Sequence, residues 1–284
     1  MNYRHAFHAG NFADVTKHII LTRILAYLMI KDAAFRVIDT HAGVGLYDLW
    51  GERAEKTGEW REGIERLITA DLPADAADLI APYLAAITAQ NPDGVLRYYP
   101  GSPMITRHML RAQDRLMALE LHPEDAQALR ENFAGDIQTR VTELDGWAAL
   151  GTHLPPKEKR GLVLVDPPFE EKGEFTRMVQ SLDKAYKRWP GGTYAYWYPI
   201  KEPADVAAYL RALKATAIPK ILRLELTIRN PSTPPRLHGT GMIVVNPPYV
   251  LETEMKIVLP VLADILAENG RGRFVIDWVR GEAS

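Results

Sequence analysis

The stretch GLVLVDPPFE, residues 161–170, is a run of aliphatic residues that ends in Asp-Pro-Pro-Phe. A short, uninterrupted apolar run that stops at prolines is typical of a strand covered on both faces, as in a parallel sheet. A second stretch, GMIVVNPPYV at 241–250, has the same form with asparagine in place of the acid. The pattern therefore predicts two buried strands, and only their neighbours in the chain can separate a functional strand end from a structural one.

Outward from these stretches, apolar strand patterns alternate with amphipathic helix patterns. The other expected strands are 35–39, 115–121, 140–144, 193–199, 221–228 and 273–279, and the expected helices include 11–31, 172–189, 201–216 and 251–267. Segments 221–228 and 241–245 flank a proline-rich loop, so we expect them to pair as a hairpin. The alternation predicts an α/β, Rossmann-like fold with a mostly parallel central sheet and helices on both faces.

Residues 55–94 interrupt this alternation, because they contain amphipathic helix patterns and no strand, and they end in the turn signal NPDG. We therefore expect a main domain formed by residues 1–54 and 95–284, with residues 55–94 inserted as a helical subdomain.

Composition excludes several classes of protein. The chain has 284 residues, a net charge of −2 and no cysteine, so neither a disulfide framework nor a cysteine metal site is possible. The charge argues against a generally basic nucleic-acid binder, although local basic clusters remain near the amino terminus and at Arg107–Arg115. Neither a signal peptide nor an apolar stretch of membrane-spanning length is evident, so we expect a cytoplasmic protein without a membrane partner. A monomer is the default expectation.

Functional residues are expected just past the strands, because ligands of open parallel sheets bind beyond the carboxyl ends of the strands. Four successive strands are followed there by polar residues or glycine: Asp39, His41, Gly43 and Gly45, then Glu120, then Asp145 and Gly146, then Asp166. Glycines allow backbone N–H groups to approach a ligand closely. Glu120 could accept hydrogen bonds from two ribose hydroxyls, and Asp145 could meet an adenine amino group. The series predicts a nucleoside-cofactor site.

A nicotinamide dehydrogenase fits this series poorly. Its fingerprint requires a third glycine where this chain has Asp48, and a ribose-binding acid about 20 residues further on. S-adenosylmethionine fits better, because its methyltransferases use a shorter glycine turn and place the ribose acid after the next strand.

The Asp-Pro-Pro-Phe end suits methyl transfer to an amino group. The lone pair of such a group on a base is delocalised into the ring, and the Asp166 carboxylate and the Pro167 carbonyl can both accept its N–H bonds. The Phe169 ring could stack on a flipped base, and Asp166 could accept the departing proton. The motif is shared by amino-methyltransferases that act on adenine, cytosine or glutamine, so it indicates the reaction class better than the substrate.

The amino-terminal segment YRHAFHAGNFADVTKH, residues 3–18, resembles the start of the RlmJ family, bacterial methyltransferases that modify N6 of one adenine in 23S ribosomal RNA. The resemblance continues through DTHAGVGLYDL, ERAEKTGEW, LRYYPGSP, GLVLVDPPFE, YAYWYP and GMIVVNPP, and covers nearly the whole chain. It implies a class I methyltransferase fold with a helical insertion. The one departure is Phe169, where the family pattern has tyrosine.

The resemblance also implies roles for individual residues. The S-adenosylmethionine site would comprise His18, His41, Gly43, Ser102, Glu120, Asp145, Gly146 and Asp166. Asp166, Pro167 and Phe169 would form the catalytic motif, and Tyr3, Arg4 and Lys17 would contact RNA. The expected partner is naked or partly assembled 23S RNA, lying across the amino-terminal and Arg107–Arg115 basic faces.

Other interpretations remain open at this point. The same motif could methylate DNA adenine or a protein glutamine, and a non-catalytic RNA-binding module could keep the fold. A zinc site built from the histidines is disfavoured, because no carboxylate or cysteine has ligand spacing. The stretch Asn246-Pro247-Pro248-Tyr249 is expected to be a structural strand end, because it is far along the chain from the cofactor positions.

Overall fold

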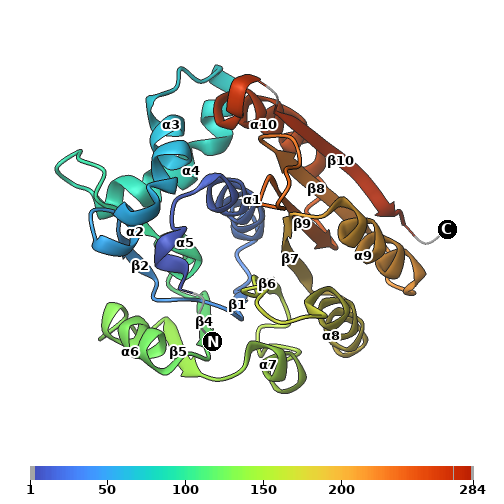
Figure 1. Ribbon diagram of the computed structural model, residues 1–284. Helices are drawn as coiled ribbons and strands as arrows, with labels where there is room; N and C mark the ends of the chain where they lie inside the picture. The colour runs from blue at the N-terminus through green and yellow to red at the C-terminus, as the bar shows by residue number, and fades with distance from the viewer. Residues whose placement is uncertain (1–3, 271, 283–284) are drawn as a thin grey trace.

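The computed structural model describes residues 4–270 and 272–282. In this part of the chain the main feature is an eight-stranded sheet with the order β5-β4-β1-β6-β7-β9-β8-β10 (Figure 1). Its strands are β1 (Arg36–Asp39), β4 (Arg115–Glu120), β5 (Thr139–Glu143), β6 (Gly161–Val165), β7 (Thr193–Ile200), β8 (Ile221–Thr227), β9 (Gly239–Val245) and β10 (Arg273–Arg280). Every residue of β6 is buried, as the apolar run predicted.

Strand direction determines where the strand ends lie. Strands β5, β4, β1, β6 and β7 are parallel. Strand β9 runs antiparallel to both β7 and β8, and β10 runs antiparallel to β8. The mostly parallel sheet and the 221–228/241–245 hairpin are therefore confirmed. Because β9 runs against β7, the two Pro-Pro stretches leave the sheet at opposite edges.

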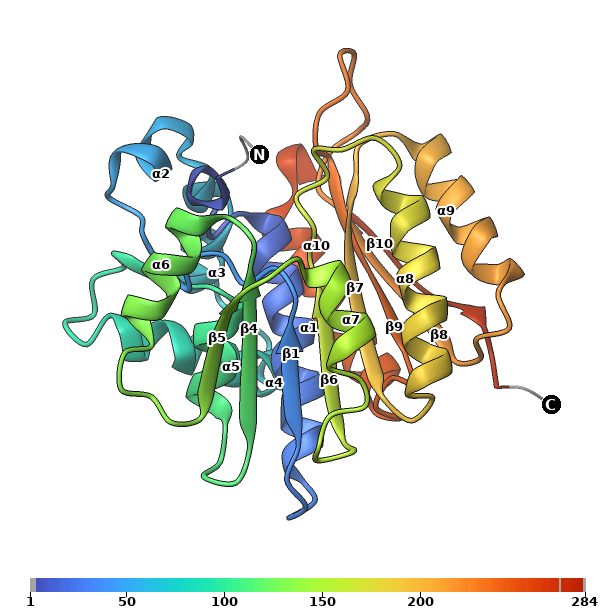
Figure 2. The same ribbon diagram turned by 90° about the horizontal axis from the view of Figure 1, so that it is seen from below.

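Helices cover both faces of the sheet (Figure 2). One apolar core includes residues of α1 (Phe12–Met29), α5 (Ser102–Met109), α6 (Pro123–Asn132) and α10 (Leu251–Leu266). The other includes residues of α7 (Gly146–Thr152), α8 (Glu174–Arg188) and α9 (Pro203–Ala215). The α/β, Rossmann-like architecture expected from the strand–helix alternation is thus observed.

Helix α1 begins where its sequence predicts. The Asn11 side-chain oxygen accepts hydrogen bonds from the backbone N–H groups of Ala13 at 2.9 Å and Asp14 at 3.0 Å. Such a cap satisfies N–H groups that have no partner within the helix. Helix α1 is buried around most of its circumference, because α4, α5 and α10 all pack against it.

Helical segments lie between two very short strands that the sequence did not reveal. Strand β2 (Leu46–Asp48) pairs antiparallel with β3 (Tyr98–Pro100). Between them lie α2 (Glu52–Thr57), η2 (Glu59–Glu62), α3 (Ile64–Thr69) and α4 (Ala74–Gln90), and two further single turns are η1 (His5–Phe7) and η3 (Glu268–Gly270). The exact subdomain boundaries at 55 and 94 stay a prediction. None of the helices in the described part of the chain combines the length and the apolar composition that a membrane span requires.

Candidate active site

A cavity of about 580 Å³ lies at the carboxyl ends of β1, β4 and β6. This volume falls in the usual range for small-molecule sites. The cavity is lined by every residue expected to bind the cofactor, namely His18, His41, Gly43, Ser102, Glu120, Asp145, Gly146 and Asp166. Residues that are up to 148 positions apart in the sequence therefore line the same cavity.

The turn after β1 holds the backbone close to the cavity. Gly43 has a φ of +61°, a left-handed conformation that favours glycine, and its N–H donates to Glu120 Oε2 at 2.9 Å. A Cβ at this position would lie 2.2 Å from the Tyr47 hydroxyl. A Cβ at Gly146 would lie 2.2 Å from the Thr40 carbonyl oxygen, so α7 can approach this turn only through a glycine.

Two of the carboxylates that line the cavity belong to Glu120 and Asp145. Besides the bond from Gly43, Glu120 Oε1 accepts from the His122 N–H at 2.8 Å, and burial raises the pKa of Glu120. Asp145 caps α7 by accepting from the Trp147 N–H at 2.9 Å. Each carboxylate keeps lone pairs for additional donors.

Two buried polar atoms lack hydrogen-bond partners among the described residues: His18 Nε2, on a residue that lines the cavity, and Asp39 Oδ1, on a residue that lies behind the cavity residue Ser102. His18 Nδ1 lies 2.7 Å from the Tyr99 hydroxyl, and Ser102 Oγ donates to Asp39 Oδ2 at 2.6 Å. Burial raises the pKa of Asp39 to about 7. Because unpaired buried polar groups are costly, this pair indicates a site that a polar ligand completes.

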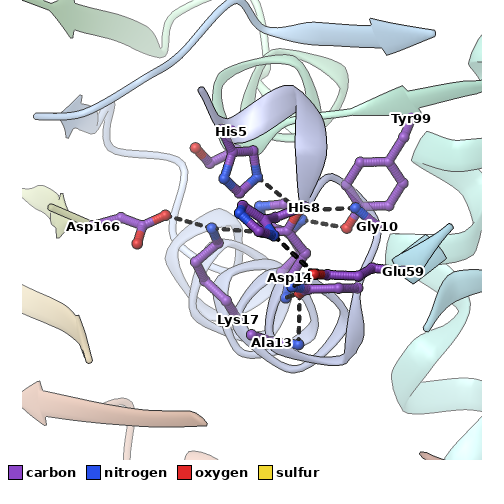
Figure 3. Close-up of polar contacts among 12 residues, drawn as sticks. His5, His8, Gly10, Ala13, Asp14, Lys17, Glu59, Tyr99 and Asp166 are labelled. Carbon is purple, nitrogen blue, oxygen red and sulfur yellow. Dashed lines mark hydrogen bonds and ion pairs between the residues drawn. The ribbon is translucent and has the colours of Figure 1, made fainter. Parts of the chain in front are cut away.

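A buried charge cluster joins α1 to the end of β6 (Figure 3). The Lys17 amine lies 2.8 Å from Asp14 Oδ1 and also contacts Asp166 Oδ2, while His5 Nε2 lies 2.9 Å from Asp14 Oδ2. Burial alone would raise the pKa of Asp14, but His5 and Lys17 hold that pKa well below its usual value. Burial alone would lower the pKa of Lys17, but Asp14 and Asp166 raise it. Asp166 is thus held next to a permanent cation.

The predicted catalytic residues do not all face this cavity. Asp166 and Pro167 line it, whereas Phe169 lines a neighbouring cavity. Phe169 has a φ of +53°, and its ring packs edge-to-face against Phe175 and Trp197. A left-handed backbone is uncommon for a bulky residue. The stacking of a flipped base on Phe169 stays a prediction, because Phe169 does not line the cavity that Asp166 lines.

The three residues predicted to bind RNA do not form one surface. Tyr3 lies outside the described residues. Arg4 pairs with Glu124 and Asp125 of α6, each at 2.6 Å, which fastens the amino-terminal segment beside the cavity. Lys17 is only 4% exposed, so it can meet a base that enters the cavity but not an RNA strand outside it.

The Arg107–Arg115 cluster does not lie beside the cavity, and the expectation that RNA lies across it stays a prediction. Arg115 begins β4, whose other end carries Glu120, so the cluster lies at the opposite edge of the sheet. Arg107 pairs with Asp136 at 2.5 Å, and Arg111 pairs with Asp114 at 2.8 Å. These arginines stabilise loops at the amino ends of the strands.

The second Pro-Pro stretch also lies at that opposite edge. Asn246 follows β9 beside the start of β7, where Thr193 Oγ1 donates to the Asn246 carbonyl oxygen at 3.1 Å. The Asn246 side chain donates to the carbonyl oxygens of Pro190 and Gly192, both at 2.8 Å. Asn246 has a φ of +51°, which asparagine tolerates better than most residues. This geometry supports a structural role.

Replacing Asn246 by alanine should lower the free energy of unfolding by about 1–3 kcal/mol, because two hydrogen bonds disappear and alanine is less favourable at a positive φ. Chemical denaturation measures this loss. A variant as stable as the original protein would contradict the structural assignment.

His18 should make stability depend on pH. Burial and the charge of Lys17 lower the pKa of His18 well below its usual value. The unfolded chain therefore takes up a proton below about pH 6.5 that the folded protein does not, so stability is full above this pH and falls as the pH falls. Between pH 6.5 and 5.5 the protein should lose about 1 kcal/mol more than a His18→Gln variant in urea unfolding. Parallel losses in both proteins would contradict this assignment.

Several residues in the cavity were not expected from the sequence. These are His5, Ala42, Tyr47, Gly101, Leu121, Asp125, Trp147, Pro168, Glu170, Glu171, Glu174 and Arg177. Trp147 follows the Asp145-Gly146 pair, and its ring packs edge-to-face on His41 with centroids 5.3 Å apart. The position of Trp147 directly after Gly146, a predicted cofactor residue, is the sequence signal that could have identified it. Among the described residues, no group of three metal-ligand side chains is close enough to hold a metal ion.

The chain resembles known proteins over its whole length. Residues 32–280 match the family model described as "Ribosomal RNA large subunit methyltransferase D, RlmJ". A Haemophilus influenzae protein named ribosomal RNA large subunit methyltransferase J is 45% identical over 99% of this chain and 100% of its own. The Escherichia coli protein of that name is 44% identical over 98% and 99%.

Structural comparison gives the same result. A crystal structure of a Legionella pneumophila protein, 37% identical in sequence, superposes with a TM-score of 0.87 over 95% of this chain and 98% of that one. The family model covers most of the chain, and the two named relatives match it from end to end. The chain therefore belongs to the RlmJ family of ribosomal RNA large subunit methyltransferases.

Proposed function

We propose that this protein uses S-adenosylmethionine to methylate N6 of an adenine in 23S ribosomal RNA. The observation that carries this proposal is the single cavity in which the Asp166-Pro167 end of β6 meets the predicted cofactor residues. The relatives are named as methyltransferases of large-subunit ribosomal RNA, which supports RNA as the substrate.

The cofactor residues fit S-adenosylmethionine chemically. The unpaired His18 Nε2 and Asp39 Oδ1 suit the charged amino-acid end, and the half-satisfied Glu120 suits the ribose hydroxyls. Asp145 and the Gly146 backbone suit the adenine edge. When bound, the cofactor supplies an electrophilic methyl group next to a sulfonium sulfur.

The target amino group is oriented by the end of β6. Asp166 Oδ2 is held by Lys17, so Oδ1 is the oxygen that can accept an N–H from the adenine. The Pro167 carbonyl can accept the second N–H, and the two prolines offer no competing N–H. Together these acceptors align the nitrogen lone pair for attack, and Asp166 can accept the proton released after transfer.

Lys17 keeps this acceptor in position. A carboxylate at a protein surface samples several rotamers, whereas Asp166 is fastened to an amine that is itself held by Asp14. The Trp197 ring lies 5.9 Å below the same amine and limits its movement. A preorganised acceptor of this kind costs little reorganisation during the reaction.

Substrate choice can be tested in one experiment. The purified protein is incubated with labelled S-adenosylmethionine and, separately, with unmodified 23S RNA, DNA containing adenine, and a glutamine-containing protein. We expect label only in the RNA. Label in DNA or in the protein would contradict the proposed substrate while leaving the reaction class intact.

A non-catalytic RNA-binding role predicts a different result. Calorimetry with S-adenosylmethionine should give saturable binding to this protein, and Glu120→Ala should weaken it. Tight RNA binding without cofactor binding would contradict catalysis altogether.

A further inference from the structure

A second cavity, of about 490 Å³, lies beside the first at the carboxyl ends of β6 and β7. It is enclosed by the loop after β6, the start of α8, the end of β7 and one face of α9. The residues that line it are Phe169, Glu171, Lys172, Gly173, Glu174, Phe175, Thr176, Pro199, Lys201, Glu202, Asp205, Ala208, Tyr209 and Ala212. The proposed function leaves this cavity without a role.

The two cavities are neighbours that share a wall. Glu171 and Glu174 line both, and the strand end that carries Asp166 leads within three residues to Phe169 in the second cavity. Both cavities therefore belong to the same edge of the sheet. An RNA strand with its target nucleotide at Asp166 can therefore place the neighbouring nucleotide in this second cavity.

The walls of the second cavity suit a flat ring. Phe175 lies 5.0 Å from Phe169 and 4.9 Å from Tyr209, measured between ring centroids. Ala208 and Ala212, one turn apart on α9, add small side chains that leave space. Aromatic surfaces with open space beside them are the usual platform for unpaired bases.

The polar groups of this cavity favour the edge of a base over a phosphate. Glu174 is 5% exposed, and its Oε1 has no hydrogen-bond partner among the described residues; the Arg177 Nη1 atom is 3.6 Å away. Glu202 and Asp205 add further acceptors. Carboxylates repel phosphate but accept N–H bonds from bases. The exposed Lys172 and Lys201 can meet the flanking phosphates.

We propose that the second cavity binds the base of a nucleotide adjacent to the target adenine, through ring stacking and N–H bonds to Glu174. This inference rests on the proposed function and adds a determinant of substrate choice to it. The protein then recognises an unstacked pair of nucleotides, one base in each cavity, rather than a lone adenine.

The test uses an RNA hairpin that the protein methylates, with an abasic nucleotide placed either directly before or directly after the target adenine. Removing the base that occupies the second cavity should lower kcat/KM about tenfold, in line with measured base–aromatic stacking. Removing the other neighbour should have little effect.

Substitutions in α9 test whether the loss of kcat/KM with the abasic hairpin arises in the second cavity. Ala208→Trp fills it from an exposed position, and Ala212→Trp does so one turn further along. Both variants should methylate the intact hairpin about tenfold less efficiently and should no longer discriminate against the abasic hairpin. The matched control is Ala207→Trp, which is also exposed on α9 but does not line the cavity, and it should behave as the original protein.

Each outcome has a distinct meaning. Equal kcat/KM for the intact and both abasic hairpins would overturn this inference and leave the proposed function standing. Full discrimination by folded Ala208→Trp and Ala212→Trp variants would also overturn it. Absence of methylation of every RNA would refute the proposed function and, with it, this inference.

Discussion

Replacing Asp166 by asparagine is expected to lower the rate of methyl transfer by roughly 10²–10⁴-fold, the range typical of a lost proton acceptor. The amide has nearly the shape of the carboxylate, but its oxygen is uncharged, and its NH₂ group faces Lys17 or the incoming amino group. S-adenosylmethionine binding should be largely kept, because His18, Asp39, Glu120 and Asp145 are unchanged. Single-turnover assays and calorimetry measure the two effects separately.

The second Pro-Pro stretch provides a matched control. Asn246→Ala alters a strand end of the same sequence pattern at the other edge of the sheet, and it should keep full turnover. If Asp166→Asn retained turnover while Asn246→Ala lost it, the assignment of the two stretches would have to be exchanged.

Replacing Lys17 by methionine is expected to lower the free energy of unfolding by about 3–5 kcal/mol, because it leaves a buried carboxylate without its partner. Asp14 is 2% exposed and would keep only His5 and the Gly10 N–H, the latter at 3.0 Å. Methionine preserves most of the buried volume, so the loss reports mainly on charge. Urea unfolding at neutral pH measures it.

A double variant distinguishes charge from packing. Lys17→Met combined with Asp14→Asn removes both buried charges, and it should be more stable than Lys17→Met alone. Methyl transfer should remain impaired in the double variant, because Asp166 still lacks its cation. A single variant that unfolds like the original protein would show that the cluster contributes little to stability.

The sequence predicted best where one residue determines a local structure. Asn11 marked the start of α1, and all-apolar runs marked the buried parallel strands. The meeting of Glu120, Asp145 and Asp166 in one cavity could be predicted because parallel topology brings successive strand ends together. His18 and Ser102, which lie on helices, were expected only from the family resemblance.

Predictions that depended on side-chain direction were less successful. Arg107 and Arg111 look like a basic face in the sequence, but Asp136 and Asp114 form ion pairs with them. The cluster also lies at the edge of the sheet opposite the cavity. The backbone of Phe169 turns into a left-handed conformation, which no propensity scale predicts for an aromatic residue. The β2–β3 ladder was missed because three-residue strands carry almost no periodic signal.

We propose that Asp166 directs a methyl group to N6 of adenine. Mass spectrometry of nucleosides from unmodified 23S RNA that has been incubated with the protein and S-adenosylmethionine tests this proposal. We predict N6-methyladenosine as the product, formed roughly 10²–10⁴-fold more slowly by the Asp166→Asn variant. A methyl group on another base or on another adenine atom, or equal product from the variant, would contradict the account.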